Sequence, residues 1–145
     1  MDVFRSMDVI GSGLSAERAR MNAISSNVAN ANSTRNADNT GPYRRKDVVL
    51  ESVPLESEFS QTLEAAHNPD VEVRVVDVRE DPTPGNRVHN PTHDDADAEG
   101  YVTMPNVNPV EEMANLISAD RAYQANVNVF QTTKQMALKA LELGR

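Results

Sequence analysis

The sequence predicts a mainly α fold with a small β or irregular insert, in which two long terminal helices pack as an antiparallel coiled-coil pair and the middle forms a β-hairpin or loop segment. Three observations predict this fold. Both ends of the 145-residue chain carry apolar residues at a spacing of three and four, which is the period of a packed helix face. All eight prolines fall between Pro42 and Pro109, and the whole net charge of −8 lies within residues 41–105. The ends are therefore expected to be neutral packing elements, and the middle a solvated, non-helical segment.

The first helix is expected over residues 3–31. Gly11 and Gly13 interrupt its pattern, and each lowers helix stability by about 1 kcal/mol relative to alanine. The segment should therefore be stable only when its apolar face packs against a partner. The seam of this helix has one polar position, Glu17, among Val3, Met7, Ile10, Leu14, Met21, Ile24, Val28 and Ala31.

A stretch rich in asparagine and serine at 25–34 is expected to end this helix, because these side chains compete for backbone hydrogen bonds and suit caps and turns. A polar loop should then lead to Gly41. An extended stretch should open at Pro42, with residues 48–50 as its buried part. Residues 52–69 fit either a short helix or a loop.

Further along the middle, residues 71–75 alternate between apolar and polar, which is typical of a half-buried strand. Residues 81–86 have the composition of a turn, and Val88 is expected to begin a return strand. A second loop at 90–100 should lead into an extended stretch at 101–105.

The second helix has a well-defined predicted start. Asn108 is a good N-cap residue, Pro109 suits the first helical position, and Glu111 occupies the third, as in a capping box. The helix should continue to Leu143, with Gly144 just past its end. Its seam has two polar positions, Asp120 and Lys134, among Met113, Leu116, Tyr123, Val127, Phe130, Ala137 and Leu141.

We therefore divide the chain into an N-terminal helix at 1–32, a middle acidic and proline-rich loop or β segment at 33–108, and a C-terminal helix at 109–145. From the residues alone, the two seams could form the core of a helical hairpin within one chain or an interface between chains. The three polar seam positions favour a defined register with specific partners.

The composition argues against several functions. An acidic chain is a poor nucleic-acid binder, and the single basic run at 44–46 is too short to change this. The absence of cysteine excludes disulfides and zinc–thiolate sites. The start has neither the basic nor the apolar region of a signal peptide, and no window approaches the ~18 apolar residues of a membrane span. These features fit a cytoplasmic protein, or one exported without a cleavable signal.

The densest polar cluster runs from His89 to Glu99. Two of its histidines are four residues apart, a spacing that aligns metal ligands on a helix, but Pro91 argues against a helix there. Its carboxylates resemble the first half of a calcium loop, yet Asn106 stands where a bidentate glutamate is required. The chain also lacks a Gly-x-Ser-x-Gly motif, and its histidines lie in proline-rich loops. We therefore expect no enzyme activity and no catalytic, cofactor-binding or metal site.

Two groups of stretches resemble the signatures of the bacterial flagellar rod and hook family. Residues 26–34, followed by 41–46, resemble the N-terminal signature, in which an Ala-Asn-x-Asn-Thr core leads to a glycine, an aromatic and a basic residue. Residues 96–102, 105–108 and 121–127 look like the C-terminal signature. The motif positions in this sequence are Asn27, Asn30, Asn32, Gly41, Pro42, Tyr43, Gly100, Tyr101, Pro105, Asn106, Asn108, Arg121, Gln124 and Asn126.

The resemblance implies a structural subunit of the proximal rod of the flagellar basal body, since distal-rod and hook relatives are longer in the middle. Such a subunit would assemble helically through its terminal helices and transmit torque across the periplasm. It would be exported through the flagellar type III apparatus without a cleavable signal. Its expected partners are copies of itself and the rod subunits FlgB, FlgF, FlgG and FliE, with no nucleic acid.

The subunit interface is expected on the two helical seams. Its expected residues are Val3, Met7, Ile10, Leu14, Met21, Ile24, Val28, Met113, Leu116, Ile117, Tyr123, Val127, Phe130 and Leu141. The alternative function is a soluble coiled-coil adaptor or scaffold without a flagellar role, which would use the acidic middle as a binding loop.

Overall fold

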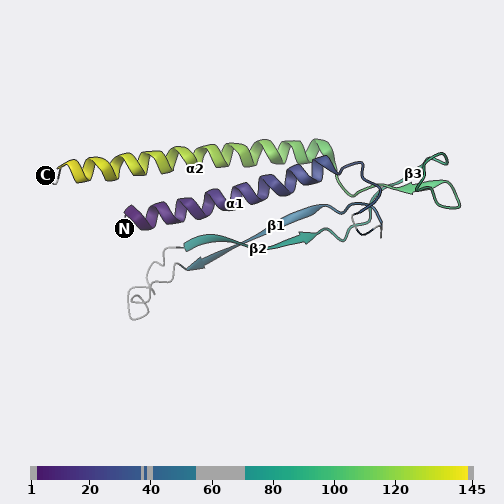
Figure 1. Cartoon of the computed structure of the whole chain (residues 1–145), viewed down its shortest axis with the longest axis horizontal. Helices are drawn as coiled ribbons and strands as arrows, with labels where there is room; N and C mark the ends of the chain where they lie inside the picture. The colour runs from purple at the N-terminus through teal and green to yellow at the C-terminus, as the bar shows by residue number, and fades with distance from the viewer. Residues whose placement is uncertain (1–2, 37, 39–40, 55–70, 144–145) are drawn as a thin grey trace. The chain divides into compact units, whose positions relative to one another are not determined.

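A computed structural model describes residues 3–36, 38, 41–54 and 71–143 of the chain. The helices and strands follow one another as α1 (Val3–Ala29), β1 (Lys46–Pro54), β2 (Val71–Glu80), β3 (Arg87–His89), β4 (Tyr101–Thr103) and α2 (Pro109–Leu143) (Figure 1). The mainly α fold with a small β insert is confirmed. Most of the ambiguous stretch at 52–69 lies outside the described residues. Neither described helix is long and apolar enough to span a bilayer.

The chain divides into two compact units. The first comprises Met1–Ala19, Val49–Asp77 and Ala119–Arg145, and the second comprises Arg20–Val48 and Val78–Ser118. Each unit therefore takes residues from both helices and from the middle of the sequence. The boundaries of these compact units differ from those of the three sequence segments proposed above. The division into three segments remains a prediction.

Both helices form where the sequence predicts them. Helix α1 ends at Ala29, two residues before the expected end. Helix α2 spans Pro109–Leu143, the predicted range. Its cap also matches the prediction, because the side-chain oxygen of Asn108 accepts a hydrogen bond from the backbone N–H of Val110 at 3.2 Å.

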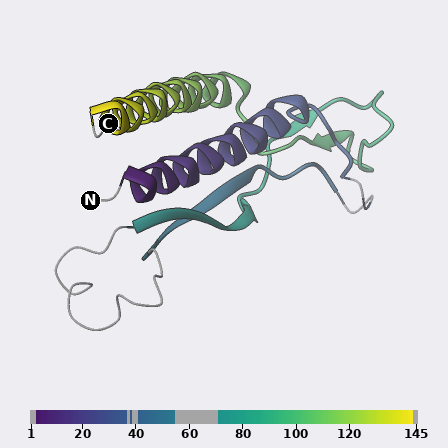
Figure 2. The ribbon, with the colours of Figure 1, turned by 60° about the vertical axis from the view of Figure 1, so that its left-hand side comes forward.

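In the first unit, α1 lies between α2 and the antiparallel pair of strands β1 and β2 (Figures 1 and 2). The hydroxyl of Ser12 connects the helix to the strands, since it donates to the Val9 carbonyl at 2.8 Å and accepts from the Val73 amide at 3.0 Å. Apart from Glu72 and Val73, which are half-buried, every residue of β2 is exposed, and Leu50 of β1 is exposed too. The expected burial of residues 48–50 and 71–75 was therefore only partly correct, because a two-stranded ribbon has a single covered face.

In the second unit, β3 and β4 form an antiparallel hairpin in which Arg87 pairs with Thr103 and His89 with Tyr101. The return strand expected at Val88 is confirmed, and its partner is β4. Within the turn predicted at 81–86 the structure has a bend at Thr83, where the Asp81 carboxylate accepts a hydrogen bond from the Thr83 amide at 2.9 Å. Hydrogen bonds from the side chain and the backbone of Thr83 hold the pKa of Asp81 below its usual value.

The hairpin packs closely against the chain that leads into it. A side chain at Gly85 would place its Cβ 1.8 Å from the Met104 carbonyl oxygen, so only glycine fits there. Val102, at the centre of β4, is buried.

The buried apolar residues of the helices are mostly alanines. Among the described residues, Ile24 is the one large apolar side chain that is buried on a helix. The buried apolar residues are Ala16, Ala23, Ile24, Ala31 and Ala119 on or near the helices, with Tyr43 and Val102 elsewhere. Small side chains allow helices to approach closely. Alanine side chains bury little apolar area. Polar contacts therefore contribute much of what holds the helices and the middle segment together.

Candidate assembly interface and its polar junction

Asn27 is the centre of a buried hydrogen-bond network in the second unit. Its side chain is 0% exposed. The amide nitrogen donates to the Lys46 carbonyl at 2.9 Å and to the Glu112 carboxylate at 3.0 Å. The amide oxygen accepts from the Tyr43 hydroxyl at 3.0 Å and from the Lys46 backbone N–H at 2.8 Å. Both hydrogens and both acceptor positions of the amide are thus used, and one side chain joins α1, α2 and the start of β1.

Glu112 connects this network to a cation. It is 1% exposed, and its second oxygen accepts a hydrogen bond from the Arg45 Nε at 2.8 Å. This bond raises the pKa of Arg45 above its usual value, against the opposing effect of burial. A buried carboxylate is tolerated only when it is paired and hydrogen-bonded, and here Arg45 and Asn27 meet that requirement.

Asn106 fixes the chain that carries Arg45. Its side-chain oxygen accepts from the Arg45 backbone N–H at 2.8 Å, and its amide donates to the Asp81 carbonyl at 3.3 Å. The Asp81 amide donates in turn to the Arg45 carbonyl at 2.8 Å. We call Asn27, Tyr43, Arg45, Asn106 and Glu112 the polar junction.

The exit from α1 is tied to the same network. Asn30 donates to the Ser26 carbonyl at 2.9 Å and accepts from the Ser33 hydroxyl at 3.1 Å. The Tyr43 hydroxyl lies 3.2 Å from the Ser26 hydroxyl, and the backbone N–H of Tyr43 donates to the Ser33 carbonyl at 3.0 Å. The asparagine-rich stretch therefore ends the helix and returns the chain to the junction.

The structure brings some motif residues together and leaves others apart. Asn27, Asn30, Tyr43, Asn106 and Asn108 lie at the junction or cap the helices beside it, and Pro105 is buried there. Asn126 faces Gly13, with its amide nitrogen 3.6 Å from where a Cβ would stand. The remaining motif residues differ in burial. They are exposed at Asn32, Tyr101, Arg121 and Gln124 and half-buried at Gly41, Pro42 and Gly100.

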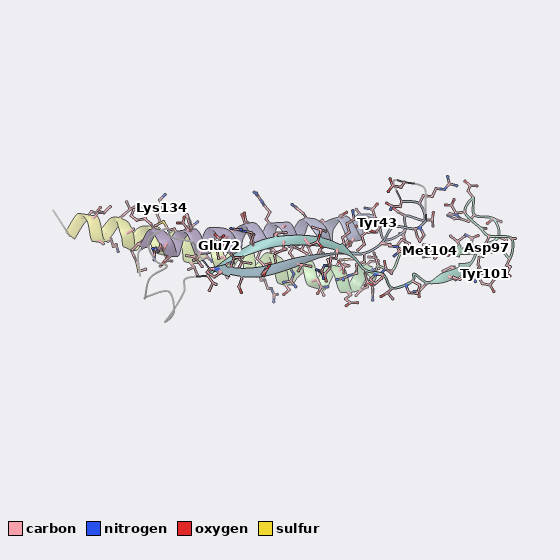
Figure 3. The ribbon with its side chains drawn as sticks, turned by 90° about the horizontal axis from the view of Figure 1, so that it is seen from below. Tyr43, Glu72, Asp97, Tyr101, Met104 and Lys134 are labelled. Atoms are coloured by element: carbon pink, nitrogen blue, oxygen red, sulfur yellow. The ribbon has the colours of Figure 1, made fainter. Side chains whose placement is uncertain are left out.

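The acidic loop is organised by hydrogen bonds among its own residues. Asp97 accepts from the Tyr101 amide at 2.8 Å and from the Glu99 amide at 3.0 Å, and the first of these is the main reason that its pKa is lowered. Asp97 also pairs with Arg87, whose guanidinium lies 4.9 Å from the Tyr101 ring centroid (Figure 3). Gly100 has φ +80°, a conformation that favours glycine.

Asp95 ties this loop to the segment that follows α1. It accepts hydrogen bonds from Thr34, at 2.7 Å, and from Arg35, and both lower its pKa. Among the residues that the structure describes, no group of three or more histidine, aspartate or glutamate side chains could hold a metal. The carboxylates of Asp95 and Asp97 serve as acceptors for backbone and side-chain groups.

The expected interface residues fall into three classes of exposure. Ile24 is buried, and Met7, Ile10, Leu14, Met21, Val28, Leu116, Tyr123, Val127 and Phe130 are half-buried. Val3, Met113, Ile117 and Leu141 are exposed. Their contact with other subunits remains a prediction.

The buried face of α2 differs from the expected seam at three positions. Glu112, Ala119 and Thr133 are buried, whereas the seam placed Met113, Asp120 and Lys134 there, and these three are exposed. The physical reason is the polar junction, because Glu112 must face Asn27, and small side chains then follow at seven-residue intervals. The exposure of Met113 leaves it available on the outer face of the helix together with Val110 and Ile117.

Sequence reasoning missed the roles of Glu112 and Arg45. A pattern search for apolar seams ignores a buried ion pair, because each charge looks like an ordinary solvated residue. A signal existed in Asn27, a polar residue one position before Val28 of the first seam. Its hydrogen bonds to the junction could not be anticipated from spacing.

A broad groove lies in the first unit. It has a volume of about 810 Å³ and is lined by Met7, Asp8, Gly11, Ser12 and Ser15 of α1, Glu72 of β2 and Phe130 of α2. We call it the Gly11 groove, because a Cβ added at Gly11 would meet no atom within 4 Å.

The sequence matches two family descriptions. Residues 7–37 match "Flagella basal body rod protein", and residues 98–143 match "Flagellar basal body rod FlgEFG protein C-terminal". The matched segments contain the asparagine-rich exit of α1 and the whole of α2.

Full-length relatives agree with these matches. The chain is 43% identical over 150 residues to the flagellar basal-body rod protein FlgC of Bacillus subtilis (strain 168) and 43% identical over 148 residues to that of Yersinia enterocolitica. It is 41% identical over 145 residues to the FlgC of Salmonella typhimurium (strain LT2), and each comparison covers 100% of both chains. The chain therefore belongs to the FlgC family of flagellar basal-body rod proteins.

Proposed function

We propose that this chain is a structural subunit of the bacterial flagellar rod, in its proximal part, which assembles helically and transmits torque across the periplasm. The observation that carries the proposal is the identity of 41–43% along the whole length to proteins named FlgC. The polar junction supports a structural role, since its charged and polar groups are saturated by one another. The chain acts by association, and catalysis has no part in it.

We infer that the two helices form an antiparallel coiled-coil pair. Two contacts support this, one in each unit: Gly13 faces Asn126, and Asn27 binds Glu112. Fourteen residues separate the first member of each contact on α1, and fourteen separate the second members on α2 in the opposite direction. Fourteen residues are two heptads, and the buried positions of α2 at 112, 119 and 133 keep the same repeat.

We infer that the exposed apolar residues on the outer face of α2 contact neighbouring subunits. Val110, Met113 and Ile117 follow a helical spacing on this face and are exposed by 75, 49 and 55%. A contiguous exposed apolar patch of this kind is typical of an interaction surface. The partners would be copies of the chain and the rod subunits FlgB, FlgF, FlgG and FliE, reached after export through the flagellar type III apparatus without a cleavable signal.

The function is tested by genetic removal and biochemical location. We expect a strain that lacks this chain to be non-motile and to form no complete rod, and expression of the chain to restore both. Hook–basal bodies purified from the complemented strain should contain the chain. Recovery of the chain only as a discrete soluble oligomer, absent from these particles, would contradict the proposal and support the adaptor function.

Replacing Ile117 with glutamate is expected to block incorporation without unfolding the chain. The side chain is 55% exposed, so the charge remains solvated in the free subunit, whereas in an apolar contact it would lose its hydration. We expect incorporation into hook–basal bodies to fall at least about tenfold, the equivalent of about 1.4 kcal/mol of binding energy.

The matched control for this substitution is Ser118→Glu, which places the same charge on the next exposed residue of α2. Circular dichroism and immunoblots of the purified particles compare the two variants. Equal incorporation of both variants would show that the outer face of α2 does not contact a neighbour.

A further inference from the structure

The Gly11 groove combines apolar walls with negative charge. Met7 and Phe130 provide apolar surface, while Asp8 is exposed at the same groove and Glu72 contributes a second carboxylate. Glu72 already accepts a hydrogen bond from Arg74 at 2.6 Å, so Asp8 is the principal carboxylate for an incoming cation. At Gly11 the surface of α1 is bare, which leaves room for the side chain of another molecule.

The end of α2 has the complementary character. Lys134, Leu138 and Leu141 lie at positions i, i+4 and i+7 and therefore share one face of the helix. Leu138 is 52% exposed and Leu141 is 70% exposed. Figure 3 labels Lys134 on α2 and Glu72 on β2.

Leu141 follows Thr133 and Ala137 at four-residue steps, on the side of α2 that is buried further toward its start. Thr133 is buried and Ala137 half-buried, but Leu141, four residues further along, is exposed.

We propose that the Gly11 groove of one copy receives the end of α2 from a second copy. Lys134 faces Asp8, and Leu138 and Leu141 lie over Gly11 between Met7 and Phe130. Charge and apolar character are complementary across this contact. The surfaces are different on the two copies, so the contact is heterologous, and it repeats into an open helical array when its rotation does not close a ring. The inference rests on the proposed function and specifies the self-contact within it.

Substitution of Gly11 with leucine tests the groove. The new side chain meets no atom of its own chain at the Cβ, and leucine favours the helix more than glycine does. The variant should therefore be at least as helical as the wild-type chain, while its incorporation into hook–basal bodies falls at least tenfold. The control is Arg18→Leu, an exposed position of α1 outside the groove, which should incorporate normally. Normal incorporation of Gly11→Leu would overturn the proposal.

Cross-linking tests the identity of the occupant. The chain contains no cysteine, so Ser15→Cys in the groove and Leu138→Cys on α2 can be placed in separate copies that are expressed together. Oxidation of purified hook–basal bodies should yield a product of twice the chain mass. The pair Ser15→Cys with Ser118→Cys, whose second site lies outside the docking face, should yield none.

Two results would overturn the inference. One is the absence of this dimer from particles that contain both variants, and the other is a cross-link to a protein of different mass. In either case the proposed function stands, since the chain is in the particle. Absence of the wild-type chain from the particle would instead refute the proposed function.

Discussion

Replacing Asn27 with alanine is expected to lower the free energy of unfolding by about 3 kcal/mol or more. The substitution removes four hydrogen bonds at once, to Tyr43, Glu112 and both backbone groups of Lys46. Each buried polar group that is left unsatisfied costs about 1–3 kcal/mol. The Glu112 carboxylate oxygen that accepts from Asn27 would lose this partner. Because Glu112 is buried, water cannot replace the lost hydrogen bond.

Urea unfolding followed by circular dichroism measures this effect. The control is Asn22→Ala, the same substitution at an exposed position of the same helix, which should change stability by less than about 0.5 kcal/mol. Similar midpoints for the two variants would mean that the junction does not hold the helices together.

Replacing Glu112 with leucine is expected to destabilise the chain by about 3 kcal/mol, near the lower end of the range for a broken buried ion pair. Arg45 would lose its 2.8 Å hydrogen bond and its counter-charge. The loss is limited because the Arg45 side chain is 26% exposed and retains some hydration. Asn27 would lose one acceptor as well.

The paired variant separates the ion pair from general packing. Adding Arg45→Met to Glu112→Leu removes the cation, which has lost its buried partner and keeps its exposed pairing with Asp47. The double variant should recover at least half of the lost stability. Such recovery would follow from the general finding that an apolar pair can replace a buried ion pair with little loss. A double variant that is less stable than Glu112→Leu alone would show that Arg45 contributes through its other contacts.

The elements that the sequence predicted well are those with strong local signals. Asn108 and Pro109 define the start of α2 because the cap and the fixed φ of proline act within a few residues. The asparagine-rich stretch after Val28 ends α1 for a similar reason. The turn before β3 forms through a hydrogen bond between neighbours, Asp81 and Thr83.

The candidate interface was less accessible to sequence reasoning. Periodicity alone placed Met113 on the covered side of α2, whereas the structure buries Glu112 and exposes Met113. The apolar pattern around α2 is nearly continuous, so several rotations of the helix about its axis satisfy it almost equally. A polar contact between residues 85 positions apart selects one of them.

By itself, the sequence determined two long terminal helices, an acidic middle that contains strands and turns, and the membership of a rod family, because each depends on local propensity or on motif. The rotation of α2 about its own axis, the pairing of β3 with β4 and the bare surface at Gly11 were decided only by the tertiary structure. Each depends on which residues, far apart in the sequence, form hydrogen bonds and pack against one another. Such contacts between distant residues produce no repeating pattern in the sequence.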